Sequence, residues 1–122
     1  MSMRVNYVVL YVDDTEICRQ FWLEQVGMIE KGRIQVGDFA VVKVGFADQP
    51  FSFELVPLAM MADNPDGLDL ATPSVALHAD DLEAAHAELV ARGVTAVDIG
   101  EHGGVRSFAF SDPEGRWFAV TG

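Results

Sequence analysis

One acidic residue lies in the middle of a hydrophobic stretch. Glu54 belongs to the run FSFELVP at 51–57, which has the alternating pattern of a β-strand. A charge inside such a strand is costly to bury unless a partner meets it. Arg106, a bound cation or water could supply that partner. Two roles are therefore open for Glu54, a contact with a ligand and a purely structural, hydrogen-bonded carboxylate.

Histidine and cysteine are the other residue types that could do chemistry here. His78 is the best placed for acid–base work, since histidine side chains titrate near neutral pH, and it could act with Glu54 if both reached one substrate. We expect His86 on a solvated helix face and His102 in a mobile loop. The single cysteine, Cys18, is expected to be a buried and inert thiol. The sequence contains no nucleophile elbow, phosphate loop or dinucleotide fingerprint.

The elements that position these residues repeat along the chain. Residues 5–14 (VNYVVLYVDD) align with 72–81 (TPSVALHADD), and each stretch predicts a strand that is closed by paired acids. A helix is expected after each pair, beginning at an Asp cap and ending near Gly27 or Gly93. Three more strands then follow in each half. We expect them at 32–36, 39–45 and 51–57, and again at 95–99, 105–111 and 116–121.

This order of elements predicts an α+β fold made of two βαβββ modules. The modules span 3–57 and 72–122, and a linker rich in Pro, Gly, Asn and Asp joins them at 58–71. Together they form a single domain over 1–122, a length that allows a real hydrophobic core.

Composition narrows the possible partners. The chain has 19 acidic and 8 basic residues and a net charge of −11, which argues against a nucleic-acid ligand because no basic patch could neutralise phosphates. Acidity would favour a cationic ligand, although it also serves solubility alone. No apolar run is long enough to span a membrane, and one cysteine cannot form an internal disulfide, so we expect a cytoplasmic protein.

The order and spacing of several motifs resemble the vicinal oxygen chelate superfamily, which includes glyoxalase I, extradiol dioxygenases, fosfomycin-resistance enzymes and bleomycin-resistance proteins. The motifs are the opening strand with its two acids, FWLEQVGM, FELV, ADDLEAAHAELVARGV and FSDPEGRWFAV. The resemblance implies that the two modules form a cup-shaped open barrel, and that the protein is a homodimer.

The resemblance also implies four metal-ligand positions, which the metal-dependent members usually fill with His or Glu. In this chain those positions are Tyr7, Glu54, Ser74 and Ala119. Only Glu54 is a competent ligand for a divalent ion, whereas a catalytic zinc site has about three protein ligands. We therefore expect no metal cofactor.

Strand parity predicts which side chains face the cup, because every second residue of a strand shares a side. Phe110 would lie opposite Trp117 if a four-residue loop closes the hairpin at DPEG, and Phe108 would then face the cup as well. An aromatic wall with a few polar groups suits a small aromatic ligand, although the same side chains could simply be core. Trp22 is expected in the core or at a dimer interface. The ligand-binding candidates are Tyr7, Tyr11, Glu54, Ser74, His78, Phe108, Phe110 and Trp117.

Three functions are open. The first is a metal-free protein resembling bleomycin-resistance proteins, which sequesters an aromatic compound, including cationic ones, and so confers antibiotic resistance. The second is a lyase or dioxygenase-like enzyme with a non-standard or absent metal site, in which His78, Glu54 and Tyr7 do the work. The third is a domain that serves a larger assembly through its dimer surface.

Overall fold

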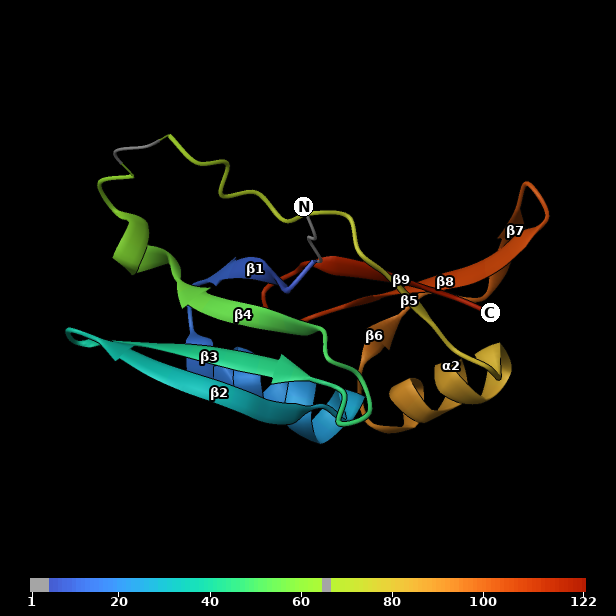
Figure 1. The fold of residues 1–122 in the computed structure, drawn as a ribbon. Helices are drawn as coiled ribbons and strands as arrows, with labels where there is room; N and C mark the ends of the chain where they lie inside the picture. Colours follow the sequence, from blue (N-terminus) through green and yellow to red (C-terminus); the bar gives the residue numbers. More distant parts are fainter. Residues whose placement is uncertain (1–4, 65–66) are drawn as a thin grey trace, which may run out of the picture. The chain divides into compact units, whose positions relative to one another are not determined.

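The computed structural model describes residues 5–64 and 67–122. Residues 3 and 4 of the expected first module, and 65 and 66 of the expected linker, lie outside the described residues. The chain divides into two compact units between Thr72 and Pro73. Each unit contains one β-sheet and one main helical segment (Figure 1), which confirms the α+β fold. No helix in the described part of the chain is long and apolar enough to cross a membrane.

The first unit is a four-stranded sheet in the spatial order β1-β4-β3-β2. β1 and β4 are parallel, and the other neighbouring strands are antiparallel. Figure 1 shows β4, β3 and β2 side by side. The elements are β1 (Tyr7–Val12), the helix α1 (Thr15–Gln20), the π-helical segment η1 (Phe21–Val26), β2 (Ile29–Val36), β3 (Phe39–Gly45), β4 (Ser52–Pro57) and the 3-10 turn η2 (Leu58–Met61).

The helical segment of this unit begins and ends where the sequence predicts. The carboxylate of Asp14 accepts a hydrogen bond from the backbone N–H of Ile17 at 3.0 Å, which caps α1. Gly27 ends η1 in the left-handed conformation, with φ of 94°, which glycine adopts without strain.

The helical segment covers one face of the sheet and forms the core of this unit. Trp22 is fully buried, and its ring lies edge-on against Phe53 with centroids 5.1 Å apart. Cys18 is also fully buried, which confirms the predicted burial of this thiol. Since side chains alternate along β4, Phe53 and Leu55 face the helix and Glu54 faces away from it.

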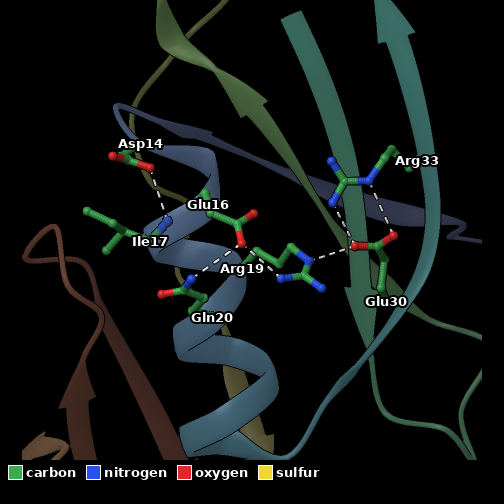
Figure 2. Close-up of polar contacts among 7 residues, drawn as sticks. All are labelled: Asp14, Glu16, Ile17, Arg19, Gln20, Glu30 and Arg33. Atoms are coloured by element: carbon green, nitrogen blue, oxygen red, sulfur yellow. Dashed lines mark hydrogen bonds and ion pairs between the residues drawn. The ribbon is translucent and has the colours of Figure 1, made fainter.

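A charged cluster ties α1 to the edge strand β2 (Figure 2). Arg19 donates from Nε to Glu30 at 2.7 Å and from Nη1 to Glu16 at 3.0 Å. Arg33 donates to the same Glu30 carboxylate at 2.9 Å. The hydrogen bond from Arg33, followed by that from Arg19, lowers the pKa of Glu30 to about 2.

The second unit is a sheet in the order β5-β9-β8-β6, with β7 paired to β8. The expected strand at 95–99 is reduced to two residues, and β7 was not predicted. Gly103 and Gly104, both with positive φ, make the two-residue turn that pairs β7 with β8. The elements are β5 (Ala76–His78), α2 (Leu82–Ala91), β6 (Thr95–Ala96), β7 (Gly100–His102), β8 (Val105–Ser111) and β9 (Trp117–Thr121).

The helix α2 covers one face of this second sheet. Asp81 caps it by accepting a hydrogen bond from the N–H of Ala84 at 3.0 Å. The ring of His86 lies edge-on against Phe108, with centroids 4.9 Å apart, and its Nε2 hydrogen-bonds to the carbonyl oxygen of Val97 at 2.9 Å. The prediction of a solvated face for His86 is therefore wrong, because its ring is half-buried and contacts the sheet through Phe108.

The hairpin between β8 and β9 also differs from the prediction. Asp112 pairs with Arg116, so the loop contains three residues rather than four, and Gly115 occupies its left-handed position with φ of 81°. Ser111 consequently lies opposite Trp117, and Phe110 lies opposite Phe118. Because the loop is one residue shorter than predicted, Phe110 and Trp117 lie on opposite faces of the sheet instead of sharing one.

Candidate functional site

The face of the first sheet that points away from the helix carries all three predicted site residues of this unit. Tyr7 is the register partner of Ser52, and Tyr11 is the partner of Val56. Register partners in neighbouring strands share a face, and Glu54 lies between those two partners on β4. The prediction that Tyr7, Tyr11 and Glu54 share one face is therefore confirmed. We call this surface of β1, β4 and β3 the open face of the first unit, since the helical segment covers the other one.

A lysine meets the charge of Glu54. Lys43 on β3 is the direct cross-strand partner of Glu54, and its ammonium lies 3.8 Å from the carboxylate. The Glu54 side chain is 15 % exposed, so this pairing offsets the cost of placing a carboxylate there. Arg106, an expected partner, instead forms an ion pair with Glu83 in the second unit. The signal that could have identified Lys43 is its parity in FAVVKVG, which places it on the same face once β3 and β4 are paired.

The same ammonium also contacts an aromatic ring. Nζ of Lys43 lies 4.5 Å from the ring centroid of Tyr7, within the range of a cation–π contact. Lys43 therefore reaches from β3 across β4 to β1, and contacts two of the predicted site residues, Glu54 and Tyr7. Within strands β1 to β4, Glu54 is the only acidic side chain on this face, because Glu30 points to the helix side.

The second sheet presents a smaller set of the predicted residues on its helix-free face. Ala119 pairs with Ala76, and Trp117 lies two residues before Ala119, so both share that side with His78. Trp117 is 49 % exposed there. Ser74 is exposed but precedes β5 rather than lying on it.

The expectation that Phe108 and Phe110 share a face with Trp117 is wrong. Both rings are buried on the helix side of the second sheet, where Phe108 contacts His86 and Phe110 stacks on Phe118 at 5.7 Å. They are core residues, and their placement follows from the three-residue loop at Asp112–Arg116.

The histidines add few further contacts to the helix-free faces of the two sheets. Nε2 of His78 lies 3.2 Å from a carboxylate oxygen of Asp80, and both side chains are exposed. His102 pairs with Val105 in the β7–β8 hairpin, so it is not in the loop expected for it. Glu54 and His78 belong to different units.

The residues at the four implied metal positions do not fit a divalent ion. Tyr7 faces a lysine ammonium, Ala119 has no side-chain donor, and the hydroxyl of Ser74 is a poor ligand. Glu54 is the one carboxylate among them, and Lys43 already lies beside it. Across residues 5–64 and 67–122, no group of three or more His, Cys, Asp or Glu side chains could hold a metal ion.

The comparisons with known proteins agree with this architecture. The Glyoxalase/Bleomycin resistance protein/Dioxygenase superfamily profile matches residues 4–120. The chain belongs to this superfamily. The search of curated proteins gave no match.

Several solved structures share the fold of this chain. TnmS3, an antibiotic binding protein from Streptomyces sp. CB03234, is 22 % identical with a TM-score of 0.81, covering 98 % of this chain and 95 % of its own. A superfamily member from Sphaerobacter thermophilus DSM 20745 is also 22 % identical, with a TM-score of 0.83 and coverage of 98 % and 97 %. Lactoylglutathione lyase from Agrobacterium tumefaciens is 17 % identical, with a TM-score of 0.74 and coverage of 98 % and 93 %. At these identities the likeness shows the fold alone.

Proposed function

We propose that this superfamily member is a small-molecule-binding protein that takes up an aromatic ligand without a metal cofactor. The observation that carries the proposal is the Lys43–Glu54 pair. An ammonium lies beside the one competent carboxylate, at the place where the family resemblance implies a metal ligand. Such a site cannot polarise a chelated oxygen as a Lewis acid does, but it can bind a molecule.

The residues of the helix-free faces support an aromatic ligand. Tyr7 in the first unit and Trp117 in the second are 38 % and 49 % exposed, and each is accompanied by polar side chains. Exposed aromatic rings with a few placed polar groups are typical of ligand sites. The printed description of TnmS3 as an antibiotic binding protein is consistent with this function. The ligand's identity, the homodimer and the cytoplasmic location stay predictions.

The proposal is tested by a binding screen on chelator-treated protein. A collection of aromatic compounds is screened by saturation-transfer NMR, and the affinity of each hit is measured by calorimetry. We expect binding in the presence of chelator, and no gain on adding Zn²⁺, Ni²⁺, Mn²⁺ or Fe²⁺. The fluorescence of Trp117 gives a second readout for its face, because the other tryptophan, Trp22, is fully buried.

Two variants test the two faces separately. Tyr7→Leu removes the aromatic ring from the open face of the first unit, and Trp117→Leu does so in the second. Ile17→Ala is the matched control, since Ile17 is an exposed hydrophobic residue on α1 rather than on a sheet. We expect one of the two aromatic variants to lose binding and the control to keep it. Binding that appears only with added metal, or that survives both aromatic variants, would contradict the proposal.

A further inference from the structure

The ammonium of Lys43 lies on the open face, beside both Glu54 and Tyr7. It lies 3.8 Å from the Glu54 carboxylate and 4.5 Å from the Tyr7 ring centroid, and its side chain is 31 % exposed. The three residues come from adjacent strands, β3, β4 and β1, of a sheet whose other side is covered by the helical segment. The lysine is therefore held on a rigid element rather than on a loop.

The geometry of the ion pair leaves the N–H groups of the Lys43 ammonium available for hydrogen bonds to a ligand. A separation of 3.8 Å exceeds hydrogen-bond length, so Glu54 balances the charge of Lys43 without taking one of its N–H groups. The cation–π contact with Tyr7 is electrostatic and likewise needs no particular N–H direction. A ligand oxygen that accepts from Nζ at ordinary hydrogen-bond length would make a stronger contact than either of these two.

The charge of this face also selects the ligand. Although the whole chain carries a net charge of −11, the only acid of the open face is already balanced by Lys43. A cationic ligand would have to displace Lys43 to reach Glu54. An anionic ligand needs no such displacement.

We propose that Lys43 is the residue that recognises the ligand, and that the open face of the first unit binds an aromatic compound through an anionic oxygen, such as a carboxylate, phenolate, sulfonate or phosphate. The inference rests on the proposed function and adds the charge of the ligand to it. Tyr7 supplies the ring against which the ligand's aromatic part lies. Glu54 balances the charge of the ammonium and competes with the ligand for it.

Three probes that share a naphthyl ring and carry different charges test the inference. These are 2-naphthoate, its neutral amide 2-naphthamide, and the cation 2-naphthylmethylammonium, each titrated into the full chain by calorimetry. We expect 2-naphthoate to bind about tenfold more tightly than the other two, the ratio that one charge-assisted hydrogen bond supplies. The acidic surface repels anions in general, so non-specific attraction works against this result rather than for it.

Variants of Lys43 and its neighbours test whether the preference for the anionic probe depends on Lys43. Lys43→Met should bring the affinity for 2-naphthoate down to that of the amide, and Lys43→Arg should largely keep it. Glu54→Gln should raise it, because the competing carboxylate is gone. Lys31→Met is the matched control and should change it less than twofold. It removes the same charge from the same sheet, but its ammonium donates to the carbonyl of Gln49.

The outcomes separate the inference from the proposed function. Equal binding of all three probes, or a preference that survives Lys43→Met, overturns the role of Lys43 and leaves metal-free binding in place. Tighter binding of the cation overturns the inference as well, because Glu54 would then be the recognising group. If none of the probes binds the wild-type chain, the inference fails, while the compound screen above decides the proposed function independently. Lys43→Gln, which removes the same charge, replaces Lys43→Met if that variant does not fold.

Discussion

The cluster around Glu30 allows a prediction of stability and of its dependence on pH. Glu30 accepts hydrogen bonds from Arg19 at 2.7 Å and Arg33 at 2.9 Å, and links the helix α1 to the edge strand β2 (Figure 2). Replacing Glu30 with Gln keeps the size of the side chain but removes its charge. We expect Glu30→Gln to lower the free energy of unfolding at neutral pH.

The magnitude follows from the pKa of the carboxyl group. Its pKa is about 2 in the folded chain, against 4.5 for an ordinary glutamate. At about 1.4 kcal/mol for each pH unit, that difference corresponds to about 3.5 kcal/mol before screening. The Glu30 side chain is 29 % exposed, so solvent and salt reduce the contribution, and we expect a loss of about 1 to 2 kcal/mol.

The pH dependence has a definite sign. Because folding lowers the pKa of Glu30, its contribution to stability is complete above pH 4.5 and is lost as the pH falls toward 2. The difference in unfolding free energy between wild type and Glu30→Gln should therefore be constant from pH 7 to pH 5 and shrink below pH 4.5. Other acids titrate in the same range, but they affect both proteins and cancel in this difference.

Urea unfolding measured at a series of pH values checks this prediction. Glu24→Gln is the control, since Glu24 is an exposed glutamate on η1, and its replacement should change the free energy of unfolding little at any pH. A Glu30→Gln protein as stable as wild type at pH 7, or a difference that persists unchanged at pH 3, would refute the reasoning.

Three further predictions concern the free energy of unfolding, which is measured in each case by urea unfolding. Asp112→Ala should lower the free energy of unfolding by about 3 kcal/mol, because this buried carboxylate accepts hydrogen bonds from two backbone N–H groups and a guanidinium in the β8–β9 turn. A loss below about 1 kcal/mol would mean that the turn does not depend on Asp112. Asp14→Ala and Asp81→Ala should each lower the free energy of unfolding by about 1 kcal/mol, because each residue caps a helix. The two losses should add in the double variant, since the helices are separate. A loss in only one of the two variants would show that the two caps are not equivalent. Lys43→Met should lower the free energy of unfolding by about 1 to 2 kcal/mol, because it leaves Glu54 without its cation. Adding Glu54→Gln to this variant should recover part of the loss. If it recovers none, the loss comes from another contact of the Lys43 side chain and not from the ion pair.

Much of the fold could be predicted because its signals are local. Alternation of apolar residues identifies the strands, and the Asp residues that begin the helices act as caps in both units. Gly27 and Gly93 mark the helix ends through their positive φ. The shared face of Tyr7 and Glu54 follows from parity and from the parallel pairing of β1 with β4.

The sequence-based predictions fail in two situations. In the first, the length of a loop determines which face of the sheet a side chain lies on. In the second, the partner of a residue lies on a neighbouring strand. The hairpin at Asp112 contains three loop residues, with Gly115 in the left-handed position, and this difference sends Phe108 and Phe110 to the core. Lys43 could not be assigned to Glu54 without the register of β3 against β4. A pair formed across strands has no fixed spacing in the sequence, so only the fold reveals it.

The central claim is that this member of the superfamily binds its ligand without a metal, and the most direct test is its metal content. Elemental analysis is carried out on the purified protein as isolated, and again after exposure to Zn²⁺, Ni²⁺, Mn²⁺ and Fe²⁺ with the excess removed. Our account predicts far less than one ion per chain in every case, since Lys43 lies beside the one competent carboxylate. Near-stoichiometric metal that is lost in Glu54→Gln would contradict it, and would make an enzyme the leading function.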